Sequence, residues 1–166
     1  MIHNVDARTF SVECDHIITA PPSVMPFAAV AKQWVLIFSD VEQTHLWREL
    51  LESQDYRYVR TGAWVKQPAF GWEACTIAHS WGQMPQPFGP SPVWRHDSPY
   101  GIEQPLALLL EVLERFTKPG DVVCDPFMGT GTVVKAAHQS GRRFVGIDID
   151  PERCREVEAW LTEHNK

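Results

Sequence analysis

Two acidic residues and a glycine-containing turn are the first candidates for chemistry in this sequence. An apolar run ends in Asp125, the turn that follows carries Gly129 and Gly131, and helix-forming residues then resume. A strand, a glycine turn and a helix start leave unpaired backbone N–H groups and the positive helix end facing a charged ligand. A second acid, Asp148, follows another apolar run. Two strand-end acids around such a turn predict a ligand that carries a ribose.

A second stretch that could carry chemistry is Ala20-Pro21-Pro22-Ser23. Residues 15–19 before it predict a short buried strand. The two prolines have no N–H to donate and stiffen the chain as it leaves the sheet. Because ligands bind at the carboxyl ends of strands in open α/β sheets, the segment predicts a rigid loop beside a ligand. A plain turn that closes a strand is the other interpretation.

Basic and aromatic residues gather in the middle of the chain. The basic residues are Arg57, Arg60, Lys66 and Arg95, interleaved with Tyr56, Tyr58, Trp64, Trp72, Trp81 and Trp94. One interpretation is strand-face charges beside core aromatics, and the other is a surface that binds phosphate and stacks bases. The net charge of -6 argues against a large basic footprint for nucleic acid but leaves room for a local patch.

Strands and helices must position these residues, and the apolar patterning predicts both. It predicts strands at 15–19, 34–38, 56–66, 74–78, 122–124 and 143–147. It predicts helices after residue 39 and from residues 105, 133 and 151. Strands that alternate with helices favour an α/β fold, with a mostly parallel twisted sheet and helices on both faces.

The segment 82–101 differs from the rest of the chain in composition. It carries five prolines and three glycines, Pro85, Pro87, Pro90, Pro92, Pro99, Gly82, Gly89 and Gly101. So many residues that break helices and strands predict an exposed loop without a regular element.

Length and composition favour one soluble domain. A chain of 166 residues can form a single core, and 44% hydrophobic and 22% charged residues are ordinary values for a globular protein. No apolar run approaches the ~20 residues that span a bilayer, and the N-terminus does not resemble a signal peptide, so we expect a cytoplasmic protein without a membrane partner. The four cysteines lack metal-ligand spacing, which favours reduced thiols.

The stretch 125–132, DPFMGTGT, and the stretch 19–22, TAPP, together resemble the DNA amino-methyltransferases. The proline loop precedes the glycine turn, as in the circularly permuted group of that family, and the resemblance covers nearly the whole chain. It implies a Rossmann-like methyltransferase fold with S-adenosylmethionine as cofactor. It also implies methyl transfer to the exocyclic amine of adenine or cytosine, DNA as partner, and a homodimer as one arrangement.

The resemblance also implies roles for individual residues. The methionine part of the cofactor would be lined by Asp125, Pro126, Phe127, Gly129, Thr130, Gly131 and Thr132. Asp148 would hold the ribose hydroxyls, Asp6 would lie near the adenine, and Gln104-Pro105 stands where the family has lysine-proline. A sulfonium, an amino group and a ribose diol suit strand-end carboxylates better than a diphosphate does. A dinucleotide fingerprint would also need a third glycine where Val134 stands.

The proline loop, which the resemblance makes the catalytic segment, departs from the family pattern at two positions. Ala20 stands where the family has Asp, Asn or Ser, and Ser23 stands where it has an aromatic residue. The Pro21 carbonyl can still accept a hydrogen bond from the target amine. Stacking on an aromatic ring is worth ~1–3 kcal/mol per base, and Phe27, or Trp94 or Tyr100 of the proline-rich segment, could supply that ring.

Three functions follow from these observations. The first is an active DNA amino-methyltransferase. The second is an S-adenosylmethionine-binding pseudoenzyme that serves as a subunit or a DNA-binding partner. The third is a methyltransferase that acts on another amine, such as one in RNA. Measuring cofactor binding and methyl transfer separately distinguishes the first two.

Overall fold

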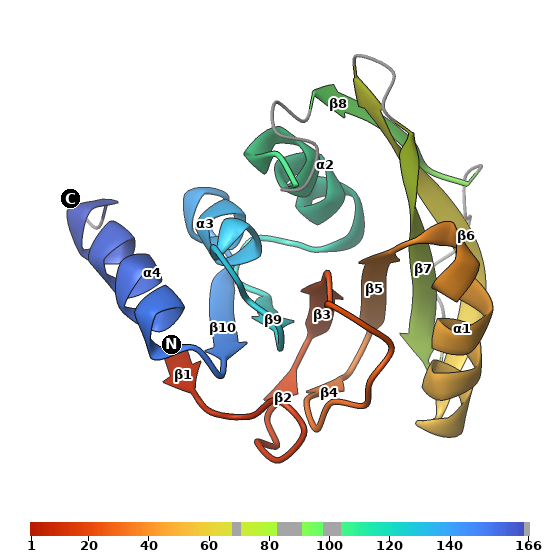
Figure 1. Ribbon diagram of the computed structural model, residues 1–166, viewed down its shortest axis with the longest axis horizontal. Coiled ribbons are helices and arrows are strands. Elements are labelled where there is room, and N and C mark those ends of the chain that lie inside the picture. Colours follow the sequence, from red (N-terminus) through yellow and green to blue (C-terminus); the bar gives the residue numbers. More distant parts are fainter. Residues whose placement is uncertain (68–70, 83–90, 98–103, 165–166) are drawn as a thin grey trace.

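The computed structural model describes residues 1–67, 71–82, 91–97 and 104–164 (Figure 1). Within them an eight-stranded sheet has the order β1-β10-β9-β3-β5-β7-β6-β8. Its strands are β1 (Ile2–Asn4), β3 (His16–Thr19), β5 (Trp34–Ser39), β6 (Tyr56–Gln67), β7 (Trp72–Ser80), β8 (Val93–Asp97), β9 (Val122–Asp125) and β10 (Arg143–Asp148). A separate two-stranded sheet joins β2 (Glu13–Cys14) and β4 (Val30–Ala31).

The helices that accompany the sheet are the short 3-10 helix η1 (Val41–Gln43), α1 (Thr44–Ser53), α2 (Leu106–Phe116), α3 (Thr132–Gln139) and α4 (Pro151–His164). No helix in the described part of the chain combines the length and apolar character needed to cross a bilayer.

Most neighbouring strands of the large sheet are parallel, as predicted. β1, β10, β9, β3 and β5 run parallel, β7 is antiparallel to both β5 and β6, and β8 is parallel to β6. From β9 the chain continues through α3 to β10 on one side, and from β3 it continues to β5 on the other. The carboxyl ends of β9 and β3 therefore flank the point where the strand order reverses, which is where open α/β sheets bind ligands.

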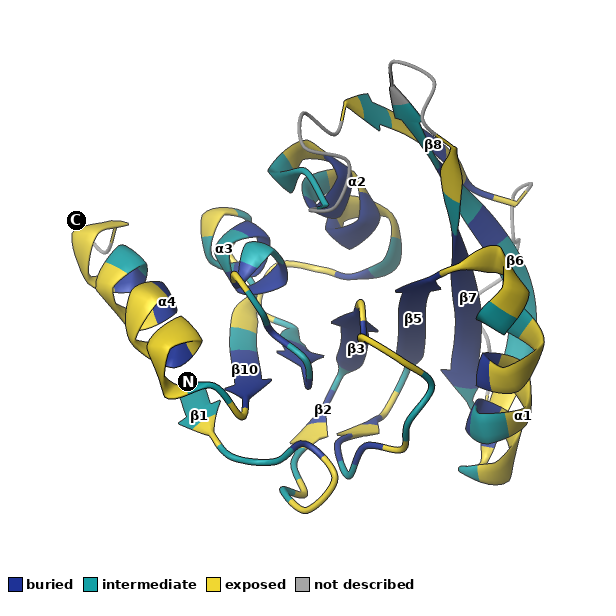
Figure 2. Ribbon diagram, in the orientation of Figure 1, coloured by how far each residue is buried: buried dark blue, intermediate teal, exposed yellow. Residues whose placement is uncertain are grey.

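Helices cover both faces of the sheet, which confirms the predicted layering. Alternate residues of β3 and β5 point to opposite faces, because side chains in a strand alternate. Ile18, Leu36 and Phe38 pack in one cluster with buried residues of α2 and α3. Ile17, Val35 and Ile37 pack in another with Trp47 and Leu51 of α1. Figure 2 shows the central strands buried and the outer helix faces exposed.

The expectation that 82–101 holds no regular element is wrong for Val93–Asp97, which forms β8 beside β6. The reason is that these five residues contain no proline or glycine and include Trp94, whose ring is 1% exposed. That ring lies 5.8 Å from Phe38 and 6.5 Å from Phe116 between ring centroids, so core packing overrides the local composition. The parts of the segment at 83–90 and 98–101 lie outside the described residues.

Candidate functional site

The candidate site lies where β9 and β3 end side by side. The Thr19 hydroxyl, at the end of β3, donates a 2.6 Å hydrogen bond to Oδ1 of Asp125, at the end of β9. Both residues are deeply buried, with Thr19 0% and Asp125 3% exposed. The strand that leads into the proline loop is thereby joined to the strand that leads into the glycine turn.

The glycine turn is held by backbone hydrogen bonds on both sides. The Phe127 N–H donates to Asp125 Oδ1 at 3.1 Å, and the Met128 N–H donates to the Ile147 carbonyl of β10 at 2.9 Å. Gly129 and Gly131 have φ of +54° and +77°, a region that favours glycine. The turn thus has a fixed shape before any ligand binds.

Asp148 at the end of β10 closes the far side of the turn. Its Oδ2 accepts the Gly129 N–H at 2.8 Å and its Oδ1 accepts the Asp150 N–H at 2.9 Å. Nη1 of Arg153, in the first turn of α4, lies 3.9 Å from Oδ2. Each carboxylate oxygen has a second lone pair, so Asp148 can hold these contacts and still accept a hydroxyl.

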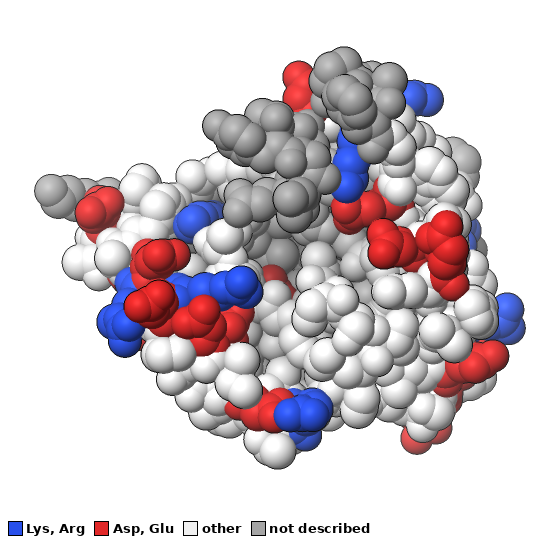
Figure 3. Space-filling model, viewed as in Figure 1, with Lys and Arg blue, Asp and Glu red and all other residues white. Residues whose placement is uncertain are grey.

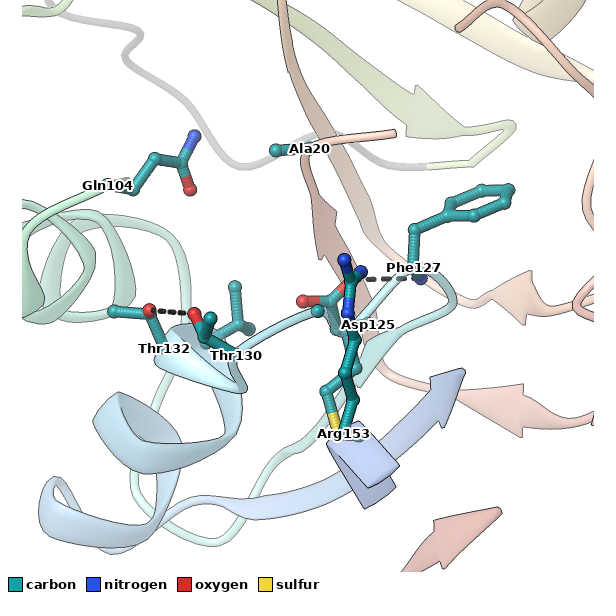
Figure 4. Close-up of a pocket in the computed structure, with 10 residues that line it drawn as sticks. Ala20, Gln104, Asp125, Phe127, Thr130, Thr132 and Arg153 are labelled. Atoms are coloured by element: carbon teal, nitrogen blue, oxygen red, sulfur yellow. Dashed lines mark hydrogen bonds between the residues drawn. The ribbon is translucent and has the colours of Figure 1, made fainter. Parts of the chain in front are cut away.

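A cavity of about 200 Å³ opens at these strand ends (Figure 4). It brings together the proline loop, Gln104 two residues before α2, the glycine turn, the start of α3 and the start of α4. Its lining residues are Ala20, Gln104, Asp125, Phe127, Met128, Gly129, Thr130, Thr132, Val133 and Arg153.

The cavity presents one buried acid and several hydrogen-bond donors. Burial raises the pKa of the Asp125 carboxyl to about 7; hydrogen bonds from Thr19 and the Phe127 N–H lower it, and the nearby Asp148 raises it. Nε2 of Gln104 is a buried donor without an acceptor among the described residues. The start of α3 at Thr132 has no side-chain cap, so its first N–H groups can serve a ligand.

The structure brings together some of the predicted site residues and not others. Seven of them line the cavity, namely Ala20, Gln104, Asp125, Phe127, Gly129, Thr130 and Thr132. The predicted residues that do not line it are Asp6, Pro21, Pro22, Ser23, Pro105, Pro126, Gly131 and Asp148. Of these, Asp148 accepts a hydrogen bond from the Gly129 N–H of the turn, Gly131 is the N-cap of α3, and Pro105 is the N-cap of α2.

Asp6 is engaged elsewhere. Both of its carboxylate oxygens accept hydrogen bonds from the guanidinium of Arg8, the shortest at 2.6 Å. These bonds hold the pKa of the Asp6 carboxyl at about 2, well below its ordinary value. The carboxylate therefore has an internal partner and does not contribute to the cavity.

Sequence reasoning missed four residues of the site, namely Thr19, Arg153 and the cavity-lining Met128 and Val133. Thr19 is a polar residue at the end of an apolar strand, immediately before the proline loop, and that placement was a usable signal. Arg153 stands three residues after Asp150 in a helix whose first turn is at the edge of the sheet. Its guanidinium lies 3.9 Å from Asp148 and 3.7 Å from Asp150. The i, i+3 spacing from Asp150 was a usable signal for the second contact.

The proline loop presents backbone rather than functional side chains. Pro21 is buried, while Ala20, Pro22 and Ser23 are exposed. The expectation that Phe27 or Trp94 supplies a stacking ring is wrong: Phe27 is buried edge-on against Phe127, with centroids 6.4 Å apart, and Trp94 fills the core. Tyr100 lies outside the described residues.

The basic and aromatic residues of β6 to β8 divide between the two interpretations. Tyr56, Trp64 and Trp94 belong to the core, and Lys66 forms a 2.6 Å ion pair with Glu73. The rings of Trp72 and Trp81, at the two ends of β7, stay exposed. On the face drawn in Figure 3, blue side chains stand beside red ones and form no continuous basic band.

Two curated relatives match parts of the chain. YubD of Escherichia coli (strain K12), whose name describes a methylase, is 47% identical over 47 residues. The Type II methyltransferase M2.DpnII of Streptococcus pneumoniae is 38% identical over 64 residues. The aligned parts make up 28% and 39% of this chain but only 21% and 24% of these relatives, so the chain spans about a quarter of their length or less.

Solved structures share the fold over nearly the whole chain. M1.HpyAVI has a TM-score of 0.76 at 21% identity, covering 96% of this chain and 97% of that one. TTHA0409 of Thermus thermophilus, in a complex with S-adenosyl-L-methionine, has a TM-score of 0.76 at 18% identity, covering 98% and 93%. The cytosine-N4-specific PvuII DNA methyltransferase has a TM-score of 0.68 at 10% identity, covering 88% and 78%. At these identities the likeness shows the fold.

A family comparison covers most of the chain and matches the observed site. The N6_N4_Mtase family, described as DNA methylase, matches residues 14–159. The match includes both the proline loop and the glycine turn, which the fold brings to one cavity. The chain belongs to the N6_N4_Mtase family of DNA methylases.

Proposed function

We propose that this protein transfers a methyl group from S-adenosylmethionine to the exocyclic amine of adenine or cytosine in DNA. The observation that carries the proposal is the cavity at the carboxyl ends of β9 and β3. It combines a buried carboxyl, Asp125, with donors on Gln104 and at the start of α3 that have no partner among the described residues. It also places Ala20 of the proline loop in the wall of the same cavity.

The residues present suit the charges of this cofactor. Asp125 suits a cation, because a buried carboxylate is stabilised by a nearby positive group. Gln104 Nε2 and the free N–H groups at the start of α3 suit a carboxylate. Asp148 keeps free lone pairs for a ribose diol at the edge of the turn. An amino acid joined to a nucleoside carries all of these groups.

The chain's own residues would position the reactants rather than exchange protons with them. When bound, the cofactor supplies an electrophilic methyl group. The glycine turn would fix its methionine part, and the Pro21 carbonyl would accept a hydrogen bond from the target amine. Holding the amine in line with the methyl group at contact distance accounts for a large part of the acceleration. The base must first leave the DNA helix to reach the cavity.

In this proposal DNA is the partner and the protein is cytoplasmic. The test is incubation of the protein with labelled S-adenosylmethionine and unmethylated DNA of mixed sequence. Nucleoside mass spectrometry of the digested DNA should reveal N6-methyladenine or N4-methylcytosine. A variant with Asp125 changed to Asn serves as the control, since it should bind cofactor less well. Absence of both products over a wide range of DNA sequences would contradict the proposal.

A further inference from the structure

The two hydrogen bonds to the Asp125 side chain both reach the same oxygen. The Thr19 hydroxyl and the Phe127 N–H donate to Oδ1, at 2.6 and 3.1 Å. No described residue donates a hydrogen bond to Oδ2. Figure 4 shows the carboxyl between the glycine turn and the proline loop, where it lines the cavity. The oxygen without a donor is thus available to a ligand.

The charged groups around Asp125 do not neutralise it. On β9 its neighbour Cys124 is buried, and a hydrogen bond between its thiol and Cys14 together with burial keeps the pKa of the Cys124 thiol well above its ordinary value. From β10, Asp148 adds a second negative charge. Arg153 of α4 lines the cavity, but its guanidinium lies against Asp148 and Asp150. β3 and α3 contribute Thr19, Thr132 and Val133, which carry no charge.

A buried carboxyl in these surroundings is partly protonated at neutral pH. Burial is the largest cause of the raised pKa of Asp125, which is about 7, and the charge of Asp148 adds to it. Without a ligand, the carboxyl is therefore about half protonated at pH 7. A cation placed against Oδ2 would reverse this balance, since an opposite charge at contact favours the ionised form.

We infer that Asp125 binds the cofactor as a carboxylate, so that loading of the cationic cofactor expels a proton from the cavity, with Thr19 as the positioning residue that keeps Oδ2 turned toward the ligand. This inference rests on the proposed function, because it takes S-adenosylmethionine as the ligand. It adds that binding is linked to pH through one group. The proton leaves to the solvent, and no other bond is made or broken.

Three ligands distinguish which cationic group of the cofactor causes the proton release. S-adenosylmethionine carries a sulfonium and an α-ammonium, S-adenosylhomocysteine carries only the α-ammonium, and methylthioadenosine carries neither. Titration calorimetry at pH 6.5 in two buffers of different ionisation enthalpy counts the protons released on binding. At this pH the α-amino group of the ligands is largely protonated already, since such groups have pKa values of about 8. The count then reports on the protein.

The inference predicts that S-adenosylmethionine releases roughly 0.8 of a proton at pH 6.5, the protonated fraction of a group with a pKa near 7. Methylthioadenosine should release none. Asp125→Asn should abolish the release for every ligand, and its own folding is checked by circular dichroism. If S-adenosylhomocysteine releases as many protons as S-adenosylmethionine, the α-ammonium causes the release. If S-adenosylhomocysteine releases fewer, the sulfonium contributes as well.

Thr19 variants test the positioning role. Thr19→Val removes the hydroxyl with little change in shape, whereas Thr19→Ser keeps it. We expect Thr19→Val to weaken S-adenosylmethionine binding at pH 6.5 by about three- to tenfold, because losing the donor to Oδ1 favours the protonated carboxyl. The loss should shrink at pH 8, and Thr19→Ser should retain wild-type affinity at both values. A merely structural role would weaken binding equally at both pH values.

Two results would overturn the inference and leave the proposed function intact. One is S-adenosylmethionine binding to the wild-type protein with no proton release at pH 6.5. The other is an equal release with methylthioadenosine. Failure of all three ligands to bind the folded protein would instead overturn the proposed function, and the inference with it.

Discussion

The two loops that meet at the cavity are built in different ways. In the glycine turn and at Asp148, backbone N–H groups donate to carboxylates and fix the shape of the site without a ligand. In the proline loop, Ala20 and Ser23 are exposed and make no comparable hydrogen bonds to described residues. The comparison teaches that the proposed cofactor site is held by an extensive set of hydrogen bonds, whereas the proposed methyl transfer would depend on a short loop with little side-chain chemistry. The Thr19–Asp125 hydrogen bond joins the strands that lead into the two loops.

The largest effect is expected where the glycine turn meets α4. A Cβ on Gly131 would lie 2.5 Å from Cγ2 of the buried Val157, and φ there is +77°. Gly131→Ala should therefore destabilise the protein by about 2–4 kcal/mol, adding overpacking to left-handed strain. Gly141→Ala is the matched control, because Gly141 has φ of +72° and nothing within 4 Å. It should cost only about 1 kcal/mol. Urea unfolding measures the free energy of unfolding of both variants. Equal losses of stability would show that the Val157 side chain can move aside at no cost.

The next effect concerns the proline loop. Ala20→Asp combined with Ser23→Tyr adds a side-chain acceptor and a ring at exposed positions. Stacking worth ~1–3 kcal/mol predicts a methyl-transfer rate about ten- to a hundredfold higher, with cofactor affinity unchanged. Rates with labelled cofactor and DNA, together with calorimetry of cofactor binding, check both parts. An unchanged rate would mean that the loop is not limited by these two positions.

A smaller effect is expected from the buried acid of the cofactor site. Because the folded pKa of Asp125, about 7, lies above its ordinary value of 3.8, the folded state binds more protons between these values. Its contribution to stability is therefore lost as pH rises toward 7. Relative to wild type, Asp125→Asn should gain stability on the order of 1 kcal/mol between pH 6 and pH 7. Urea unfolding at both pH values measures this gain, and a pH-independent difference would contradict the raised pKa.

The smallest effect lies at the opposite end of β3. His16 is buried with Nε2 3.0 Å from Asp121, and burial lowers its pKa despite that neighbour. The folded state therefore binds fewer protons than the unfolded state, and stability falls as pH drops below the ordinary value of 6.5. In an Asp125→Asn background, which removes the opposing contribution, thermal unfolding at pH 7.5 and 5.5 should show this loss. Adding His16→Gln should abolish it, whereas an equal loss with His16→Gln would point to other groups.

Sequence reasoning predicted the arrangement of strands and helices better than the side-chain contacts between them. Apolar runs that alternate with helical patterns were enough to predict a mostly parallel sheet, and strand-end acids marked the edge where the cavity lies. The Thr19–Asp125 bond joins residues 106 positions apart and depends on β3 lying beside β9, with Ile17 opposite Cys124. No local pattern contains that pairing.

The burial of Trp94 shows why local composition failed elsewhere. Prolines and glycines around it predicted a loop, but its ring is placed by Phe38 of β5 and Phe116 of α2, both distant in sequence. Phe27 is likewise buried against a partner that is distant in sequence, Phe127. Tertiary contacts therefore determine which aromatic rings are exposed. They bury Trp94 and Phe27, the two rings that the sequence offered for stacking on a target base.

The most direct test of the proposed cofactor site is calorimetric titration of S-adenosylmethionine into wild type, Asp148→Ala and Asp150→Ala. Both aspartates accept backbone N–H groups near the start of α4, but only Asp148 also holds the glycine turn. We predict that Asp148→Ala weakens binding about tenfold or more, since it removes an acceptor worth roughly 1.5–3 kcal/mol. Asp150→Ala should stay within about threefold of wild type. Equal affinity of wild type and Asp148→Ala would contradict the account.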